Sequence, residues 1–350
     1  MILIAPTSYK GTIGARAAAD AMAAGARSAG VADIDVCPVS DGGPGLIEAL
    51  LRPSARLEHV FVSGPLGSPV RARILVDGDT ALVESADTCG LHLLSAPAPL
   101  RATTRGVGEL LLEAGKRASE VVVGLGGSGT VDGGAGAAAA LGWRFRNEAG
   151  VALAPVPARL TEIARIEPGD LSLPRVVALA DVETRLCGAR GAARTFGPQK
   201  GATAADIEVL DAGLLHLAGI LARDAGRHIL DLPGGGAAGG LGAGLCAFAD
   251  ARVLPGSQWV FERLRIRERI ERADVVITGE GSYDAQSGLG KITGALIAAA
   301  RASRKPVLVV AGRVTTAVPA GVHVVAADGL LTTGDLAAIV ERELARLLPR

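Results

Sequence analysis

Short runs of aliphatic, mostly β-branched residues recur along this chain, and each run is apolar on both faces. Strands of that kind are typical of a parallel sheet that helices cover on each side. The stretches between the runs are Ala-rich with helical spacing, and this alternation predicts an α/β fold. The runs are ILIA (2–5), DIDVCPV (33–39), EVVVGLG (120–126), RVVALAD (175–181), DVVITGE (274–280), PVLVVAG (306–312) and VHVVAA (322–327).

A second architecture is expected within residues 57–85, which contain three β-rich runs separated by Gly-Pro and Asp-Gly-Asp turn signals. Such signals favour antiparallel pairing. The chain has 350 residues, more than the roughly 250–300 at which a single hydrophobic core stops growing. We therefore expect two domains, with amphipathic helices over 203–224 and 334–348 and Pro- and Gly-rich excursions over 144–175 and 226–245.

Charge and cysteine content exclude several classes of protein. The 36 basic and 36 acidic residues cancel, and no basic run with interleaved aromatic residues suggests a nucleic-acid surface. The four cysteines are far apart and lack CxxC spacing, so neither a zinc site nor a disulfide framework is expected. Without a signal peptide or an apolar run of about 18 residues, we expect a cytoplasmic protein that does not span a membrane.

Glycine-rich loops follow many of the predicted strands and combine glycine with an acid, a lysine or a hydroxyl residue. Open α/β sheets bind ligands at the carboxyl ends of their strands, where backbone N–H groups and helix N-termini suit phosphate. The loops are PTSYKGT (6–12), PVSDGGPG (38–45), GLGGSGTVDGGAG (124–136), TFGPQKGA (195–202), LPGGGAAGGLGAG (232–244) and ITGEGSYDAQSGLGK (277–291). The loop 232–244 can also be explained by close packing of small residues.

Three of the five lysines, Lys10, Lys200 and Lys291, fall inside these loops, although the chain otherwise uses Arg for positive charge. Lysine presents a compact cation to phosphate oxygens, and phosphoryl transfer chiefly requires positioning and charge neutralisation. The alternative is that these are surface lysines that happen to lie in turns. We interpret the pattern as a phosphate-handling site.

Acidic residues lie beside glycine or at a strand end in the same loops. Mg²⁺ takes one or two carboxylates plus phosphate oxygens and waters, and a substrate hydroxyl needs a carboxylate as base. Because these tasks need fewer than five acids, some are expected to cap helices, and Asp132 is placed to cap a helix over 133–142. Asp41 and Asp181 are the favoured base and metal ligand. The full set is Asp41, Asp132, Asp181, Glu280 and Asp284.

Motifs of other enzyme classes are incomplete. GLGGSG lacks the acid at a second strand end that a dinucleotide site requires, and no GxxxxGK[ST] pattern occurs. Ser128 does not form a GxSxG motif, because residue 130 is Thr, and the histidines lie outside the glycine loops. A phosphotransferase is therefore favoured over a dehydrogenase or a hydrolase.

In this order, the loops resemble those of the type I glycerate kinases, which phosphorylate glycerate with ATP and magnesium. Six or more separate motifs in the same order make chance a poor explanation. The likeness covers almost the entire chain, through IAPTSYKGT, PVSDGGPG, ESADTCGL, TTRGVGEL, GLGGSGTVDGGAG, ADVETRLCGARGAARTFGPQKGA, PGGGAAGGLGAG, ITGEGSYDAQSGLGK and PVLVVAG.

The resemblance implies two different α/β domains with the active site in the cleft between them. One would be a discontinuous Rossmann-like domain of residues 1–60 and 270–350, and the other an inserted mixed α/β domain of residues 61–269. The resemblance also implies ATP and Mg²⁺ as cofactors, a small-molecule acceptor, and the possibility of a homodimer.

The resemblance further implies a set of site residues. The candidate catalytic residues are Lys10, Asp41 and Asp181, and the candidate metal ligands are Asp181 and Asp284. The candidates for binding substrate or phosphate are Ser8, Gly127, Ser128, Arg190, Lys200, Glu280, Asp284 and Lys291. Arg190 or the nearby Arg185 would supply a cation for a substrate carboxylate.

Several neighbouring residues depart from the family's pattern. Thr7 and Pro44 each replace an acid, Val131 stands where a polar residue is usual, and Glu183 lies in a DVDNPL-like segment. Because losing a built hydrogen bond changes substrate discrimination strongly, these departures bear on the acceptor. An ATP-dependent glycerate kinase is the first hypothesis. The second is a relative acting on another polyol, sugar acid or cyclitol, or its phosphate, and the third is a non-catalytic metabolite sensor.

Overall fold

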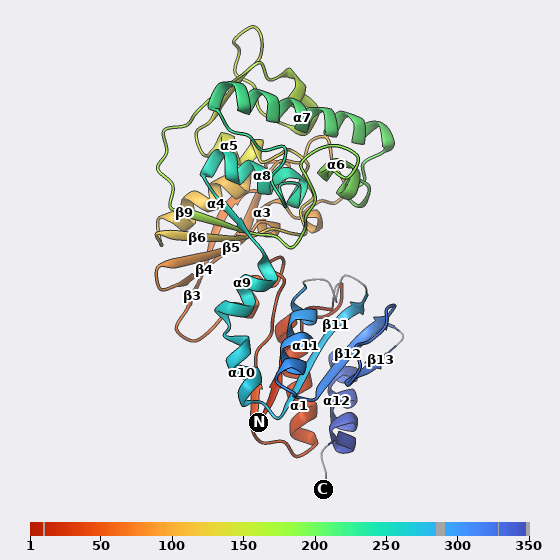
Figure 1. Ribbon diagram of the computed structural model, residues 1–350. Coiled ribbons are helices and arrows are strands. Elements are labelled where there is room, and N and C mark those ends of the chain that lie inside the picture. The colour runs from red at the N-terminus through yellow and green to blue at the C-terminus, as the bar shows by residue number, and fades with distance from the viewer. Residues whose placement is uncertain (10, 285–290, 328, 348–350) are drawn as a thin grey trace. The chain divides into compact units, whose positions relative to one another are not determined.

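The computed structural model describes residues 1–9, 11–284, 291–327 and 329–347. The chain divides into two compact units, one of residues 1–50 with 256–350 and one of residues 51–255, so it leaves the first unit once and returns once (Figure 1).

The sequence placed this division near residues 60 and 270, later than in the structure at both crossings. β3 (Arg56–Ser63) pairs with β4 (Pro69–Asp77) and so falls in the second unit. α9 (Gly256–Arg263) contacts α11 (Ile292–Ala302) and so falls in the first. These two elements account for the difference.

The first unit is built on a five-stranded parallel sheet with strand order β13-β12-β11-β1-β2. β1 and the first six residues of both β11 and β12 are buried, as expected for strands covered on both faces. The strands are β1 (Ile2–Ile4), β2 (Ile34–Val36), β11 (Val275–Tyr283), β12 (Val307–Val314) and β13 (Val322–Ala326).

Two helices of the first unit, α1 and α12, pack closely on each other and on the sheet. A Cβ added at Gly25 of α1 would lie 2.0 Å from Ala337 O of α12, so glycine permits this approach. Met22 and Leu336 join the same buried cluster as Ile277 of β11. The helix predicted over 334–348 corresponds to α12. The helices are α1 (Ala15–Ser28), α2 (Leu46–Leu50), α9 (Gly256–Arg263), α10 (Ile266–Arg272), α11 (Ile292–Ala302) and α12 (Thr333–Leu347).

The second unit contains a six-stranded mixed sheet with strand order β10-β9-β6-β5-β4-β3. β3, β4 and β5 are antiparallel, which confirms the prediction for residues 57–85, whereas β5, β6, β9 and β10 are parallel. The α/β class, with one parallel and one mixed sheet, is confirmed. The further strands are β5 (Thr80–Glu84), β6 (Glu120–Gly124), β9 (Arg175–Leu179) and β10 (Arg252–Leu254), and β7 (Arg144–Arg146) pairs separately with β8 (Arg165–Glu167).

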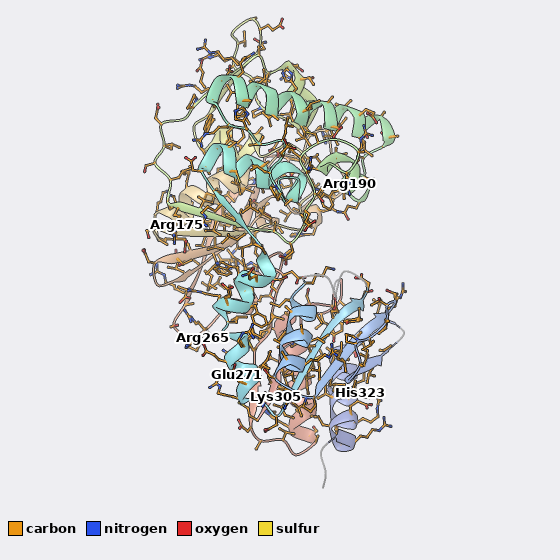
Figure 2. All side chains as sticks on the ribbon, in the orientation of Figure 1. Arg175, Arg190, Arg265, Glu271, Lys305 and His323 are labelled. Atoms are coloured by element: carbon orange, nitrogen blue, oxygen red, sulfur yellow. The ribbon has the colours of Figure 1, made fainter. Side chains whose placement is uncertain are left out.

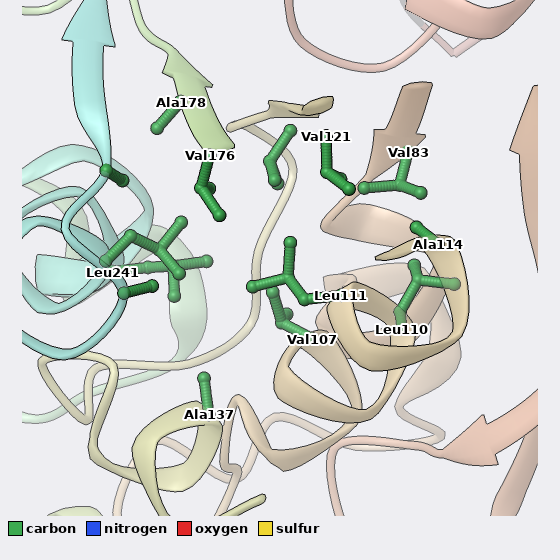
Figure 3. Packing of buried hydrophobic residues seen from close by; sticks show 14 of the residues in the cluster. Val83, Val107, Leu110, Leu111, Ala114, Val121, Ala137, Val176, Ala178 and Leu241 are labelled. Atoms are coloured by element: carbon green, nitrogen blue, oxygen red, sulfur yellow. The ribbon is translucent and has the colours of Figure 1, made fainter. Parts of the chain in front are cut away.

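Helices of the second unit bury their apolar faces against this sheet. Figure 3 shows Val107 and Leu111 of α4 beside Val121 of β6, all fully buried. The helices are α3 (Ala86–Cys89), α4 (Arg105–Gly115), α5 (Ala135–Ala140), α6 (Ala192–Phe196), α7 (Ala204–Ala225) and α8 (Ala237–Ala249), with 3₁₀ turns η1 (Leu91–Leu93), η2 (Pro157–Glu162) and η3 (Pro198–Lys200). Across the described ranges, no helix combines the length and apolarity needed to cross a membrane.

Two sequence predictions for helices in this unit had different outcomes. The predicted helix 203–224 is α7, which begins with a capping box between Thr203 and Asp206. The excursion predicted over 226–245 is wrong in its second half, because α8 begins at Ala237. Its glycines reduce intrinsic helix propensity, but they allow a buried helix to pack closely on its neighbours.

Candidate active site

The candidate residues of the first unit lie at the carboxyl ends of three strands. Ser8 follows β1, Asp41 follows β2, and Asp284 follows β11, which itself contains Glu280. Because the strands are parallel, these loops share one edge of the sheet, where open α/β sheets bind ligands. Lys291 is the N-cap residue of α11 and lies at the same edge.

Asp41 holds the beginning of α11. Its Oδ1 accepts hydrogen bonds from Ile292 N at 2.9 Å and from Ser257 Oγ at 3.2 Å. The first N–H groups of a helix have no partner within the helix, so Asp41 caps α11 from a loop 251 residues away in sequence. The carboxylate is thereby fixed one residue from Lys291. Lys10, the third catalytic candidate, lies outside the described residues.

The loop that contains Asp41 is itself tightly packed. Ser40 Oγ accepts a hydrogen bond from Gly42 N at 3.2 Å. A Cβ added at Gly256 would lie only 2.2 Å from Asp41 O, so the start of α9 touches the loop backbone directly. The Asp41 side chain therefore projects from a loop that side chains and backbone hold in place.

Glu280 lies close to two phenols, those of Tyr9 and Tyr283. It is 9% exposed, and its charge, together with burial as the larger cause, raises the pKa values of Tyr9 and Tyr283. Tyr9 also donates a hydrogen bond to Val310 O at 2.8 Å. Both tyrosines therefore stay neutral at physiological pH, and Glu280 provides negative charge inside this edge of the sheet.

Thr7, the residue that departs from the family at the first loop, binds the backbone of β11. Thr7 N donates to Gly279 O at 2.9 Å, and Thr7 Oγ1 donates to the same oxygen at 3.3 Å. The hydroxyl thus ties the loop after β1 to the neighbouring strand. An acid at this position has no proton to donate to that oxygen at neutral pH, so the departure changes local bonding as well as charge.

In the second unit, Lys200 and Ser128 are brought together. Lys200 Nζ donates hydrogen bonds to Ser128 Oγ at 2.9 Å and to Thr130 O at 2.7 Å. Lys200 is 3% exposed and Ser128 is 6% exposed. Ser128 follows Gly127, which is exposed and has a left-handed φ of 65°. The loop 195–202 therefore contributes a buried lysine that is hydrogen-bonded to the loop following β6.

Asp132 has the structural role that the sequence offered as an alternative. Its carboxylate is fully buried and accepts hydrogen bonds from Thr104 N and Thr104 Oγ1, both at 2.8 Å, and from Gly134 N and Gly136 N, both at 3.1 Å. Burial raises the pKa of this carboxyl, and the four hydrogen bonds oppose that shift. Asp132 thus joins the start of α4 to the start of α5, although Gly134 is the N-cap residue of α5.

The remaining candidates of this unit lie on an exposed segment after β9. Asp181 and Arg190 are both exposed, and Figure 2 labels Arg190 beside α6. Arg185, the other candidate cation for a carboxylate, forms an ion pair with Asp231 at 3.1 Å. The exposure of Asp181 and Arg190 contrasts with the burial of Lys200 and Ser128.

The glycine run 232–244 packs against the loop 127–136. Ala238, Gly239 and Gly240 adopt left-handed φ/ψ angles inside α8. A Cβ added at Gly239 would lie 2.0 Å from Thr130 O, and one at Gly244 would lie 2.3 Å from Gly133 O. The structure therefore supports the packing explanation for this run, which acts on the backbone of the Ser128 loop.

The other residues that depart from the family's pattern differ in how exposed they are. Val131 is fully buried in an apolar cluster with Leu214 and Leu217, so it bears on packing rather than on a ligand. Pro44 and Glu183 are exposed in their loops. Thr104 was missed by the sequence reasoning, although its segment TTRGVGEL belonged to the family likeness.

Two surface cavities of the second unit, of about 860 and 710 Å³, contain none of the candidate residues. The larger is lined by β3, α4 and the segment 171–175, with Phe61 and Leu171 among its apolar side chains. Charged side chains such as Lys116 and Asp224 line them, but neither cavity contains a residue of the phosphate-handling loops, which are therefore the better candidates for function.

Comparison with known sequences identifies these loops as a family feature. The profile described as the glycerate kinase family matches residues 2–344. The chain belongs to the glycerate kinase family. The glycerate kinase of Halalkalibacterium halodurans is 40% identical over 323 residues, which cover 89% of this chain and 85% of that relative. The glycerate 2-kinase of Escherichia coli is 40% identical over 326 residues, with coverages of 90% and 85%.

The fold agrees with this glycerate kinase assignment. A crystal structure of a Salmonella typhimurium LT2 protein, provisionally named glycerate kinase 2, has a TM-score of 0.85 with this chain. The two are 36% identical in sequence, and the match covers 99% of this chain and 97% of the other. The similarity to the glycerate kinase family therefore extends through both units.

Proposed function

We propose that this chain is an ATP-dependent glycerate kinase, which transfers the γ-phosphoryl group of ATP to a hydroxyl of glycerate. The observation that carries the proposal is the near full-length similarity, at 40% identity, to proteins named glycerate kinases. The Gly-Lys-Asp loops at strand ends supply the phosphate-binding and charge-neutralising groups that phosphoryl transfer needs.

The first unit is the better candidate for binding nucleotide phosphates. α11 spans 11 residues with Lys291 as its N-cap residue, and a helix N-terminus with an adjacent lysine attracts phosphate. Ser8 and Glu280 lie at the same edge of the sheet, and Asp41 is the proposed base for the acceptor hydroxyl. Lys10 stays a catalytic candidate from the sequence.

Magnesium is proposed as the companion of ATP. The described residues include no group of three or more His, Cys, Asp or Glu that could hold a metal. Mg²⁺ requires no such cluster, because it takes one or two carboxylates and completes its shell with phosphate oxygens and waters. Asp181 and Asp284 have the required oxygen donors and are proposed to hold the ion. When bound, it would neutralise charge on the transferred phosphoryl group.

The second unit supplies the remaining binding residues in this proposal, namely Gly127, Ser128, Lys200 and Arg190. A second candidate function keeps phosphoryl transfer but takes another polyol, sugar acid or cyclitol, or its phosphate. The replacement of acids by Thr7 and Pro44 favours it, because both residues lie in the glycine loops that follow β1 and β2. A cytoplasmic location and a possible homodimer are further proposals.

We expect the purified chain to form ADP from ATP with D-glycerate at millimolar concentration, in the presence of Mg²⁺. A coupled assay across glycerate, sugar acids and cyclitols measures the preference, with each acceptor omitted in turn as the control. No turnover of glycerate together with turnover of another acceptor would favour the second candidate. Binding of a metabolite without any turnover would indicate a sensor.

A further inference from the structure

Among the residues that the structure describes, no carboxylate directly neutralises the buried cation Lys200. Its Nζ donates to Ser128 Oγ at 2.9 Å and to Thr130 O at 2.7 Å, and the residue is 3% exposed. Among the described residues, no Asp or Glu oxygen lies within ion-pair distance of Nζ. Burying an ammonium group without a counter-charge is costly, so this arrangement is completed when an anion binds close by.

The bond from Lys200 determines which way the Ser128 hydroxyl can donate. A lysine ammonium group has three donors and no acceptor, so Ser128 Oγ accepts from Nζ and its own hydrogen must point elsewhere. Within the ranges that the structure describes, no hydrogen bond donated by Ser128 Oγ is found. Ser128 is 6% exposed and follows the exposed Gly127, so its hydroxyl lies next to the point where this loop reaches solvent.

Two titratable groups face Lys200 from the elements packed around it. Cys89 of α3 is fully buried, which raises its pKa to about 12 and keeps the thiol neutral. Asp132 lies before α5, and its carboxylate is occupied by four hydrogen bonds from Thr104, Gly134 and Gly136. Neither group offers Lys200 a direct ionic partner, and the charge of Asp132 favours the protonated form of Lys200 at long range.

We propose that the Gly127–Ser128 loop is an anion subsite in which Ser128 donates its hydroxyl hydrogen to an anionic oxygen of the ligand and Lys200, behind it, supplies the balancing charge. The oxygen belongs either to the carboxylate of glycerate or to a phosphate of the nucleotide. Lys200, named above among the binding residues, thus acts in this subsite by positioning Ser128 and supplying charge, without touching the ligand. This inference rests on the proposed kinase function.

In this subsite, ligand binding is coupled to the protonation of Lys200. Burial lowers the pKa of Lys200 to about 8, and a bound anion raises it again because it favours the ammonium form. The protonation state of Lys200 therefore does not limit affinity below about pH 8. As the pH rises through the pKa of free Lys200, affinity falls by up to about tenfold per pH unit. Above pH 8, each bound ligand takes up part of a proton.

Titration calorimetry of the wild-type chain at pH 6.5 and pH 8.5 tests this linkage. D-glycerate and ADP are titrated separately, each in two buffers that differ in ionisation enthalpy. We expect proton uptake at pH 8.5 for the ligand whose oxygen occupies the subsite. At pH 6.5 glycerate should show none, whereas the terminal phosphate of ADP titrates near this pH and exchanges protons of its own. Uptake with glycerate alone identifies the carboxylate, and uptake with ADP alone identifies a phosphate. Binding of both ligands without uptake at pH 8.5 would overturn the proposal.

Two substitutions connect the proton to Lys200. Lys200→Met should weaken the same ligand about tenfold or more, and Lys200→Arg should abolish proton uptake because guanidinium does not titrate in this range. Lys116→Met, which removes an exposed lysine that pairs with Glu113, is the matched control and should behave as wild type. Ser128→Ala should weaken the ligand without changing the unfolding temperature by more than about 2 °C.

The outcomes separate the subsite from the kinase assignment. Turnover of glycerate by the wild-type chain tests the proposed function, and this test is independent of the role of Lys200. If turnover is normal and Lys200→Met binds both ligands as tightly as Lys116→Met does, the subsite is refuted while the kinase stands. If Lys200 variants do not fold, the wild-type proton uptake still decides the question.

Discussion

Replacing Asp41 with asparagine is expected to slow phosphoryl transfer by about 10²- to 10⁴-fold while nucleotide affinity stays nearly unchanged. The asparagine Oδ1 can accept the same hydrogen bonds from Ile292 N and Ser257 Oγ, so the beginning of α11 keeps its geometry. The substitution removes only the negative charge and the capacity to accept a proton. ADP formation measures kcat, and titration with a non-hydrolysable ATP analogue measures affinity.

Two further variants separate chemistry from helix capping. Asp41→Ala removes both oxygen acceptors, so it should also lower stability by about 1 kcal/mol, the usual effect of losing a cap. Asp20→Asn removes an exposed carboxylate on α1 and should resemble wild type in turnover and stability. Wild-type turnover in Asp41→Asn, with impairment only in Asp41→Ala, would make Asp41 a positioning residue for α11 rather than the base.

Several strands of the two sheets were accessible to sequence reasoning because burial on two faces leaves a continuous apolar run, whereas β10 (Arg252–Leu254) was not predicted. ILIA, EVVVGLG and DVVITGE correspond to β1, β6 and β11, whose central residues are buried. α8 was not accessible in the same way. Its first four residues, Ala and Gly at 237–240, include left-handed residues, and its burial depends on a loop more than 100 residues earlier.

The loops that carry the candidate site were predictable, but the pairings within and between them were not. Glycine beside lysine or an acid at a strand end is visible in the sequence. The hydrogen bond from Lys200 to Ser128, 72 residues away, depends on loop conformations that tertiary contacts determine. The same is true of the cap that Asp41 provides for α11. Asp132 shows the same limit: an acid beside glycines fitted both a ligand site and a helix start, and only its four hydrogen bonds decided between them.

Gly239→Ala is expected to destabilise the second unit by roughly 3 kcal/mol, because two costs add. The left-handed backbone, with φ of 75°, costs an L-residue about 1–2 kcal/mol. The new Cβ would also lie 2.0 Å from Thr130 O, and relieving such a contact in a packed interior typically costs 1–3 kcal/mol. Denaturant unfolding followed by circular dichroism, analysed for separate transitions of the two units, measures the loss.

Gly219→Ala on α7 is a control for which the expected change in stability has the opposite sign. Gly219 is exposed within the helix, and an added Cβ would meet no atom within 4 Å, so alanine should stabilise the chain by about 0.5–1 kcal/mol.

The effect of Gly239→Ala should extend to ligand binding, since Thr130 O is also the acceptor for Lys200 Nζ. Displacing this oxygen would move the cation that supports Ser128. If the Gly239→Ala chain were as stable as the Gly219→Ala chain, the close contact between α8 and the Thr130 backbone would be contradicted.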